Sequence, residues 1–302
     1  MSNDIYNQLL EKYDSLGENP KHYLEGLLYS KPITYWDYVE VDTLLSLQKP
    51  RTNFKDEFVF IVYHQVTELV LKLMVHEVEQ VISSSHPTEE LLKEKLNRLI
   101  RYTDMLITSF DVMKDGMSHE DYNKFRLTLT PASGFQSAQF RFLEIYCTPI
   151  LNLIHKERHS EISENPDAQE YLEHVYWRLA GYNPKTKTRS TTLTLFEDKY
   201  LGVFEDYINK AKGNTVYDKF KQIESPSEEL IELMKTFDNA YNVKWPMVHY
   251  NTAKYYLTKK GEATAATGGS QWEKYLHPKY QRRTFFPKLW QNDSILNFNE
   301  KV

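Results

Sequence analysis

The chain has 302 residues, of which 41% are hydrophobic and 14% aromatic, and it carries a formal net charge of -5 at pH 7. A mildly acidic chain has no electrostatic attraction to nucleic acid or to an anionic membrane surface, so neither is expected as a partner. One cysteine, Cys147, excludes an internal disulfide, and no apolar run is expected to reach the roughly 20 residues of a membrane-spanning helix.

The first 32 residues are expected to form an N-terminal arm, and residues 33–302 a single helical domain. The N-terminal sequence MSNDIYNQLLEKYDSLGENPK has no basic segment followed by an apolar one, so no signal peptide is expected. A reducing cytoplasm is the expected location of a chain with a single cysteine.

Apolar residues recur at helical spacing along nearly the whole chain, and no convincing run of alternating strand residues is present. The pattern predicts an all-α fold, a helical bundle. The predicted helices cover about 56–83, 88–113, a short segment after the N-cap Ser118, 135–156, 168–180, 194–212 and 227–258. Pro246 is expected to kink the last helix, because proline removes a backbone donor and clashes with the preceding turn.

The helix at 56–83 is the clearest, and its acidic first turn suits a helix N-terminus. Residues at four-residue steps form a stripe along it: Phe60, His64, Glu68, Lys72 and His76. One interpretation is a solvated stripe with a Glu68–Lys72 ion pair. The other is the wall of a cavity, which the aromatic ring of Phe60 favours.

Tyr122 and Arg126 lie four residues apart on the short helix after Ser118, so phenol and guanidinium project from one face. An arginine in a pocket suits a carboxylate, because its planar fork makes two parallel hydrogen bonds. The alternative is a surface arginine paired with a neighbouring acid. The turn TPASGFQS (130–137) then leads into a helix N-terminus, which can receive an anion, although most such turns bind nothing.

His249 lies one turn after Pro246 on a largely apolar helix. A neutral histidine in such a place can bind a metal or heme iron, and the alternative is a buried histidine that is only hydrogen-bonded. The sequence has no HExxH motif, cysteine cluster, phosphate-binding glycine loop or GxSxG motif. The residues by themselves therefore predict two notable histidines and one arginine, and they name no reaction.

Five segments resemble the signatures of the tryptophan 2,3-dioxygenase family, in the same order along the chain. They are TYWDYVEVDTLLSLQKP (34–50) followed by DEFVFIVYHQVTELVLKLMVHEVE (56–79), YNKFRLTLTPASGFQSAQFRFLE (122–144), TGGS (267–270) and RRTFFPKLW (282–290). Together they extend over nearly the whole chain.

The resemblance implies an all-helical homotetramer of the heme-dependent dioxygenase fold, with heme b as its cofactor. Its substrates would be L-tryptophan and O2, with both oxygen atoms inserted across the indole C2–C3 bond to give N-formylkynurenine. The alternatives are a heme oxygenase or hydroxylase of the same superfamily acting on another indole or a tyrosine-like substrate, and a non-catalytic helical binding protein that keeps the fold.

The resemblance also implies roles for individual residues. His249 corresponds to the proximal iron ligand and His64 to the distal residue near the indole N–H. The other implied positions are substrate-binding Phe60, Tyr122, Arg126 and Thr267, the turn beside the heme at Ser133 and Gly134, and Tyr35 and Tyr38 on an arm that reaches into a neighbouring subunit's site.

The chain departs from the family pattern around the C-terminal part of this site. Pro246, Met247 and Val248 replace basic residues that usually precede the proximal histidine, and ATGGSQW replaces the common GTGGSSG. The span from His249 to Thr267 is a few residues longer than usual. These departures affect the surroundings of the heme propionates and the lid over the substrate.

Overall fold

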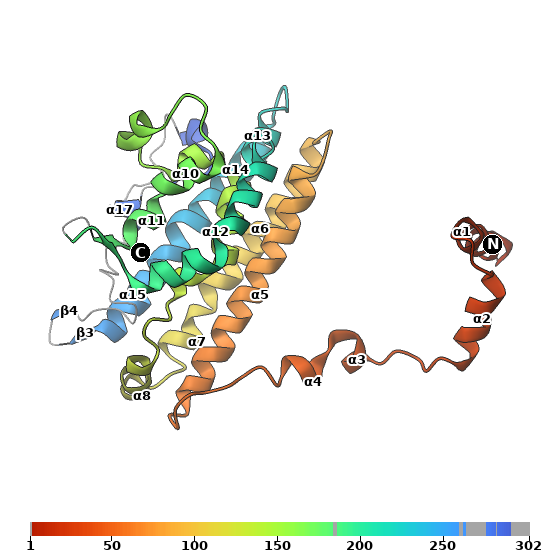
Figure 1. Ribbon diagram of the computed structural model, residues 1–302, viewed down its shortest axis with the longest axis horizontal. Coiled ribbons are helices and arrows are strands. Elements are labelled where there is room, and N and C mark those ends of the chain that lie inside the picture. The colour runs from red at the N-terminus through yellow and green to blue at the C-terminus, as the bar shows by residue number, and fades with distance from the viewer. Residues whose placement is uncertain (1, 184–185, 260–261, 264–275, 282, 291–302) are drawn as a thin grey trace. The chain divides into compact units, whose positions relative to one another are not determined.

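The computed structural model describes residues 2–183, 186–259, 262–263, 276–281 and 283–290. The chain separates into two units, residues 1–49 and residues 50–302, and we describe each by itself. The all-α fold class predicted from the sequence is confirmed, since helices make up nearly all of the regular structure in the described residues (Figure 1).

The N-terminal unit contains four short helices: α1 Ser2–Ser15, α2 Pro20–Tyr29, α3 Tyr35–Val39 and α4 Val41–Leu44. The first two pack through stacked rings of Tyr13 and Tyr23, whose centroids are 4.1 Å apart. Glu40 separates α3 from α4 in a left-handed conformation with φ 56°, which ends one helix and starts the next.

The larger unit is a helical bundle of α5 Asp56–Ile82, α6 Glu89–Thr108, α7 Phe110–Lys114, α8 His119–Phe125, α9 Ala138–Cys147, α10 Ala168–His174, α11 Tyr176–Ala180, α12 Thr191–Ala211, α13 Val216–Phe220, α14 Glu228–Asn239, α15 Trp245–Leu257 and α17 Pro278–Gln281. Two antiparallel hairpins join β1 Tyr182–Asn183 to β2 Thr188–Arg189 and β3 Thr258–Lys259 to β4 Glu262–Ala263.

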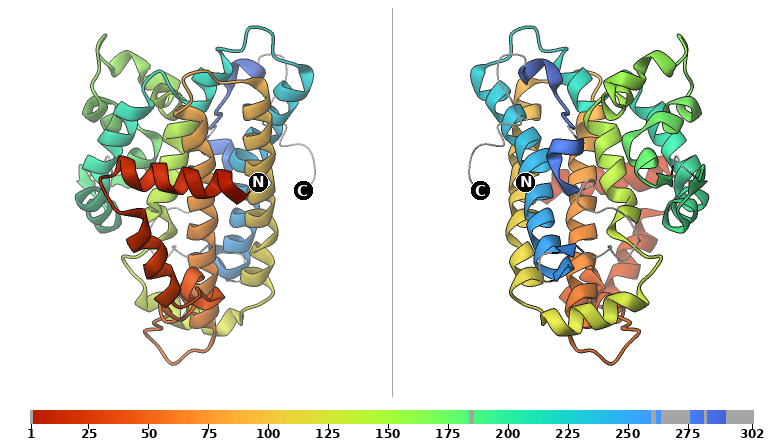
Figure 2. Two further views of the ribbon diagram at one scale, coloured as in Figure 1. Left: turned by 90° about the vertical axis from the view of Figure 1, so that its right-hand side faces the viewer. Right: turned by 90° about the vertical axis from the view of Figure 1, so that its left-hand side faces the viewer.

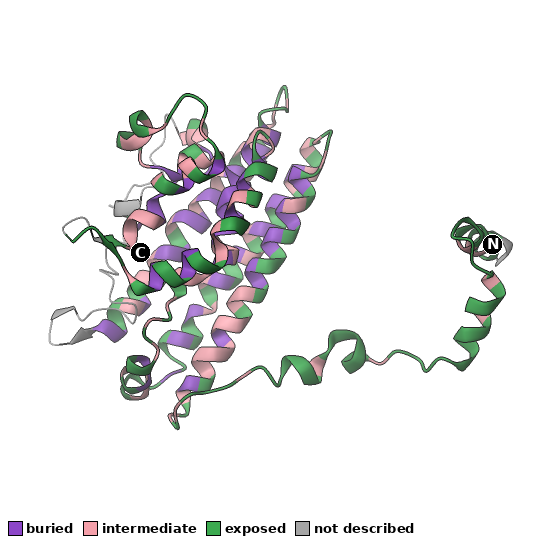
Figure 3. Cartoon of the chain, in the orientation of Figure 1, coloured by how far each residue is buried: buried purple, intermediate pink, exposed green. Residues whose placement is uncertain are grey.

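Helix α5 is the central element of the bundle and packs against both α6 and α9 (Figures 1 and 2). Helix α14 packs along α6, and α12 packs along α9. Buried faces of these helices turn toward one another (Figure 3). The largest fully buried side chains of the described residues are mostly aromatic: Trp177, Tyr146, Tyr241, Phe125, Phe196, Phe204, Phe237, Phe285 and Phe286.

Several predicted helices are shorter than expected. The segment 88–113 divides at Ser109 into α6 and α7, and the segment 168–180 divides at Val175 into α10 and α11. The helix predicted over 135–156 ends at Cys147, because Pro149 cannot donate to the helical ladder. Helix α13 was not predicted at all.

The helix predicted over 227–258 changes type just before Pro246. A π-helical segment, Ala240–Lys244, lies between α14 and α15, and Pro246 occupies the first turn of α15. Proline has no N–H to donate one turn back, and a position in the first turn of a helix tolerates this loss.

Helix α5 is long and apolar enough to cross a membrane by length and composition alone, with an 18-residue window of mean hydropathy 1.6. Every 18-residue window of α5 contains Glu68 and Lys72, so the helix has no uninterrupted apolar run of this length. In the structure α5 packs against α6 and α9 of the bundle. On its outer face the side chains of Phe58, Val66, Leu69 and Leu73 are exposed.

Candidate active site

His64 lies on α5, and its ring orientation is set by its own helix. Its Nδ1 is 2.7 Å from the backbone carbonyl oxygen of Phe60, one turn earlier. A carbonyl oxygen can only accept, so Nδ1 carries the proton and Nε2 keeps its lone pair as an acceptor. Burial lowers the pKa of His64 below its ordinary value of 6.5, which keeps the ring neutral near pH 7.

Two aromatic rings from α8 pack against Phe60, which in turn packs against His64. The Phe60 ring lies 4.1 Å from the ring of His64, 5.5 Å from Phe125 and 6.1 Å from Tyr122. The backbone N–H of Ser118, the N-cap of α8, donates to the carboxylate of Asp56 at the start of α5. This bond fixes the beginning of α8 against the first turn of α5.

Arg126 follows directly after α8 and is 9% exposed. Its Nε donates to Oδ1 of Asn123 at 3.0 Å. The structure therefore places Tyr122 against Phe60 and puts a buried guanidinium one helical turn further along. Phe60 thus contacts both His64 and Tyr122, while the place of Arg126 in the same site stays a prediction.

His249 lies on α15, and a series of rings connects it to His64. Its ring is 5.3 Å from Phe110, Phe110 is 5.6 Å from Tyr63, and Tyr63 is 5.3 Å from His64. Burial, together with the nearby His64 ring, lowers the pKa of His249 to about 4. The residue nevertheless keeps exposed surface. Both properties are expected of a ring enclosed by protein on most sides, with open space on one.

The donor set fits heme better than a metal ion held by several side chains. A neutral imidazole with accessible surface is the ligand that heme iron takes on its proximal side. Within the described residues no three His, Cys, Asp or Glu side chains cluster as a metal site would need.

Comparison with known proteins identifies the family. The tryptophan 2,3-dioxygenase family model matches residues 26–175. The tryptophan 2,3-dioxygenase of Bacillus anthracis is 27% identical, over 90% of this chain and 97% of that protein. That of Geobacillus thermodenitrificans is 29% identical, over 87% of this chain and 92% of that protein. The chain belongs to the tryptophan 2,3-dioxygenase family.

Membership of the tryptophan 2,3-dioxygenase family confirms the resemblance seen in the sequence. The family match contains His64, Arg126 and Gly134, and it ends before His249. The pairwise matches extend further, as does the one with the protein of Herpetosiphon aurantiacus, which is 29% identical over 86% of this chain and 97% of that protein.

The turn at Ser133 and Gly134 is held by a capping box. The Ser133 hydroxyl accepts from the N–H of Phe135, and the Ser133 N–H donates to Gln136 Oε1 at 3.2 Å. Gln136 Nε2 in turn donates to the carbonyl of Thr192 on α12 at 3.1 Å. Among the described residues no hydrogen bond or ring contact joins this turn to either histidine, so its place beside a heme stays a prediction.

For three predicted site residues the structure gives no position relative to this grouping. Tyr35 and Tyr38 belong to the N-terminal unit and are 73% and 77% exposed. Thr267 lies outside the residues that the structure describes.

The structure adds three residues that sequence reasoning missed. Phe110 carries the ring contact to His249, Tyr256 packs on Tyr122 with ring centroids 4.5 Å apart, and Asn123 holds Arg126. Helical spacing could have found two of them. Asn123 precedes Arg126 by three residues, and Tyr256 follows His249 by seven, so each pair shares a helix face.

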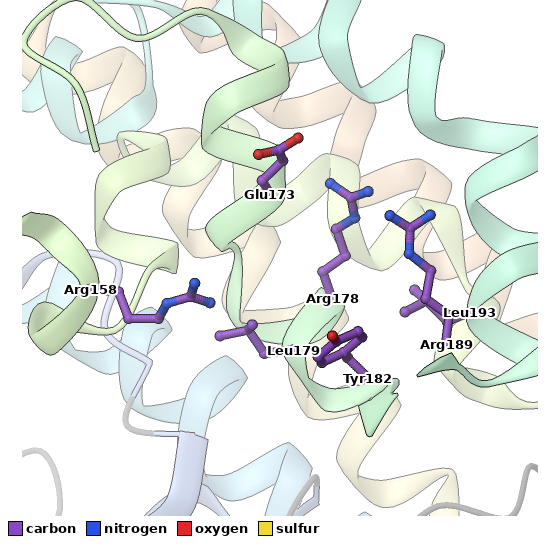
Figure 4. A pocket seen from close by; sticks show the side chains of 7 residues that line it. All are labelled: Arg158, Glu173, Arg178, Leu179, Tyr182, Arg189 and Leu193. Carbon is purple, nitrogen blue, oxygen red and sulfur yellow. The ribbon is translucent and has the colours of Figure 1, made fainter. Parts of the chain in front are cut away.

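A cleft of about 240 Å³ lies elsewhere, between α10, α11, the β1–β2 hairpin and α12 (Figure 4). Its lining residues are Arg158, Glu173, Arg178, Leu179, Tyr182, Arg189 and Leu193. Glu197 pairs with both Arg178 and Arg189, and Glu161 pairs with Arg158. Two acids thus pair with the three arginines, and the cleft contains none of the predicted site residues, so we place the chemistry at the histidines.

Proposed function

We propose that this protein is a heme-dependent tryptophan 2,3-dioxygenase, which inserts both atoms of O2 across the indole C2–C3 bond of L-tryptophan to give N-formylkynurenine. The relatives that match most of the chain carry the same name. The observation that carries the proposal is the pair of neutral histidines on α5 and α15, one beside Phe60 and the other with accessible surface.

His64 would orient the indole ring of the substrate. Its Nε2 is an acceptor, because Nδ1 donates to the Phe60 carbonyl, and the indole N–H is a donor. The Phe60 ring, packed against His64, offers an aromatic face for the flat substrate. Arg126 would bind the carboxylate through its guanidinium, with Tyr122 alongside.

His249 would hold the heme iron through a neutral ring nitrogen, with Ser133 and Gly134 beside the macrocycle and Thr267 near the amino-acid end of the substrate. The heme, when bound, supplies the iron centre for O2 chemistry. Indole is electron-rich, so the reaction needs no external reductant, and the task of the protein is mainly to position the substrate and exclude water.

We further propose a soluble, cytoplasmic homotetramer whose sites are shared between subunits. An apolar stripe of Phe58, Val66, Leu69 and Leu73 on α5, each between 37% and 49% exposed, is a liability for a free monomer, and a partner chain would bury it. Tyr35, Trp36 and Tyr38 are also exposed within the single chain. On this proposal Tyr35 and Tyr38 contribute to the site of a neighbouring subunit.

The test is to record the visible spectrum of the reduced protein before and after addition of L-tryptophan and ¹⁸O2, and to analyse the product by mass spectrometry. We expect a heme spectrum that changes on substrate binding and N-formylkynurenine that carries two labelled oxygen atoms. A hydroxylated product with one labelled atom would indicate an oxygenase of another type. Purified protein that binds no added heme would contradict the proposal and favour a non-catalytic binding protein.

A further inference from the structure

Glu57 lies in the first turn of α5 and is buried, with 1% of its surface exposed. Its carboxylate accepts from three donors of the preceding segment. The backbone N–H of Arg51 donates to Oε1 at 2.8 Å, and the backbone N–H of Thr52 donates to Oε2 at 2.7 Å. The hydroxyl of Thr52 also donates to Oε2. One side chain therefore attaches residues 51 and 52 to the start of the helix.

These bonds keep the Glu57 carboxylate charged. Burial by itself raises the pKa of a carboxyl group, but the bonds from Thr52 and Arg51 outweigh burial and lower the pKa of Glu57 below its ordinary value of 4.5. The group is therefore ionised near pH 7, and hydrogen bonds to an ionised acceptor are stronger than those between neutral groups. Residues 50–54, the entry segment, follow directly on the N-terminal unit, so Glu57 holds the point at which that unit joins the bundle.

The same turn of α5 also holds α8. The neighbouring carboxylate, Asp56, accepts from the backbone N–H of Ser118, the N-cap of α8. A second contact joins the entry segment to α8 directly, since the ammonium of Lys124 lies 5.6 Å from the centroid of the Phe54 ring. The entry segment and α8 are thus attached to one turn of one helix.

This turn leads into the proposed substrate site. Phe60 lies one turn further along α5, and its ring packs on His64 and on Tyr122 of α8. Adjacent residues of α5 therefore fix the place of the entry segment and the place of a helix that carries a predicted substrate contact.

We infer that Glu57 is a positioning residue, which fixes the entry segment to the turn of α5 that holds α8, so that the N-terminal unit leaves the bundle from one fixed point. The inference rests on the proposed function, in which Tyr35 and Tyr38 of that unit contribute to the site of a neighbouring subunit. A segment fixed at its root loses less conformational freedom when it binds a partner. Glu57 thus contributes to the affinity for L-tryptophan without touching the substrate.

Glu170 offers a matched control. It lies in the first turn of α10, where its carboxylate accepts from the backbone N–H and the hydroxyl of Ser163, seven residues earlier. Glu170→Gln therefore removes the same kind of bond between a helix and the loop before it. No predicted site residue lies on α10, so this variant controls for the general effect of replacing such a carboxylate by an amide.

The first measurement is limited proteolysis of the full chain by trypsin, whose readout does not depend on activity. Trypsin cuts after Arg51, and the fragment that begins at Thr52 is identified by its mass. Cleavage follows the population of the opened segment, and the amide of Glu57→Gln keeps one accepting oxygen. We expect this variant to be cut after Arg51 about tenfold faster than the parent, the effect of one lost hydrogen bond to a charged group. Glu170→Gln should be cut there at the parent rate. Equal rates for Glu57→Gln and the parent would overturn the inference.

Thr52→Val gives a second test if Glu57→Gln folds poorly. This variant keeps the carboxylate and both backbone donors, and it removes only the hydroxyl donor. We expect cleavage after Arg51 to rise about threefold. Each rate is divided by that of a synthetic peptide of residues 47–57 with the same substitution, which corrects for the preference of trypsin itself. A corrected rate equal to that of the parent would contradict the capture of this segment by Glu57.

The second measurement is the Kd for L-tryptophan, taken from the heme spectrum. We expect Glu57→Gln to raise Kd about threefold or more, at unchanged heme content and oligomeric state, and Glu170→Gln to leave Kd as in the parent. The variant Tyr35→Ala with Tyr38→Ala should also raise Kd, and adding Glu57→Gln to it should change nothing further, because the contact that Glu57 supports is already lost. Additive effects would overturn the inference, since Glu57 would then act on the bundle alone.

The two measurements separate this inference from the proposed function. If the variant of Tyr35 and Tyr38 binds L-tryptophan as tightly as the parent, the proposed sharing of sites fails, and cleavage after Arg51 alone decides whether Glu57 holds the entry segment. If that variant binds more weakly while Glu57→Gln is cut and binds as the parent does, only the role of Glu57 is overturned. Faster cleavage of Glu57→Gln with an unchanged Kd would overturn its contribution to affinity.

Discussion

His64 and His249 are both neutral near pH 7, because protein around each ring disfavours the charged form and lowers its pKa. Neutrality suits two different tasks. The lone pair of His249 can serve a metal, and the lone pair of His64 is directed to Nε2 by the bond from Nδ1 to the Phe60 carbonyl. The contact with the Phe60 carbonyl thus distinguishes His64 from His249, although the two side chains are chemically identical.

We predict that His249→Ala purifies with little or no heme, because the single protein ligand to iron is lost. Heme content is measured from the visible spectrum and from the ratio of heme to protein. Added imidazole should restore binding if the cavity left by the side chain admits it. His86→Ala, at an exposed histidine, is the control for general destabilisation. Full heme occupancy with an unchanged ferrous spectrum would contradict the assignment of His249 as the iron ligand.

We predict that His64→Ala stays measurably active, with kcat/KM for L-tryptophan reduced about fivefold or more. A single neutral hydrogen bond contributes about 1 kcal/mol, and misalignment of the indole adds to that. The parent enzyme should discriminate against 1-methyltryptophan, which lacks the N–H, and the variant should not. His76→Ala, three turns along the same helix and exposed, is the control. Complete inactivity with heme and substrate still bound would indicate proton abstraction by His64 instead.

At the scale of elements, the junction between α6 and α14 depends on an N-cap residue that forms hydrogen bonds with both helices. Ser227 is the N-cap of α14, where its hydroxyl accepts from the N–H of Leu230. The same hydroxyl donates to Glu89 in the first turn of α6. Glu89 also pairs with Lys93 at 2.7 Å, and Lys93 pairs with Glu229 of α14 at 2.6 Å. These bonds join the beginnings of α6 and α14.

This joint predicts a pH dependence of stability. The bonds from Lys93 and Ser227 lower the pKa of Glu89 from 4.5 to about 2. A lowered pKa in the folded state means that the ionised carboxylate stabilises the fold above about pH 4.5, and that this contribution is lost as the pH falls toward 2.

We therefore expect Glu89→Gln to lower the free energy of unfolding at pH 7, with a difference from the parent that shrinks between pH 4.5 and 2. Urea denaturation across this range measures it, and Glu90→Gln on the neighbouring exposed residue is the control. A difference that is constant with pH would show that the charge of Glu89 contributes nothing.

Sequence patterns predicted the helices of this bundle better than their ends. Periodicity located α5 almost to the residue, and Ser118 was correctly predicted as the N-cap of α8. The pattern did not reveal the breaks at Ser109 and Val175, since apolar spacing continues through both. Whether a helix divides depends on the neighbours that its next turn would meet, and those neighbours are distant in sequence.

At the scale of the whole molecule, the single chain exposes two apolar surfaces: the stripe on α5 and the aromatic residues of α3. Apolar patches of this kind on soluble proteins mark interaction sites. We propose that a second copy of the chain covers these surfaces.

We predict that subunits complement one another. An arm variant, Tyr35→Ala with Tyr38→Ala, and a heme-site variant, His249→Ala, should each be nearly inactive alone. Mixed oligomers should contain some sites with an intact arm and an intact heme site, so activity should partly return after subunit exchange. Sedimentation and a tagged pull-down check that exchange occurs. A fully active monomer, or no recovery of activity despite proven subunit exchange, would contradict the proposal that subunits share their sites.

The sequence by itself determined the fold class, the family and the residues proposed for the site. Helical periodicity follows from local spacing along the chain, and the family signatures are contiguous segments, so both can be read without a structure. The assignment of Thr267, Tyr35 and Tyr38 stays a prediction from that resemblance.

Only the tertiary structure decided how these residues act on one another. The link from Arg126 through Asn123 to Tyr256 joins positions 126, 123 and 256, and the rings from His249 to His64 pass through Phe110 and Tyr63. Burial lowers the pKa of both histidines only after distant helices have packed around them. Contacts and desolvation arise from segments far apart in the chain, and no local pattern encodes which segments will meet.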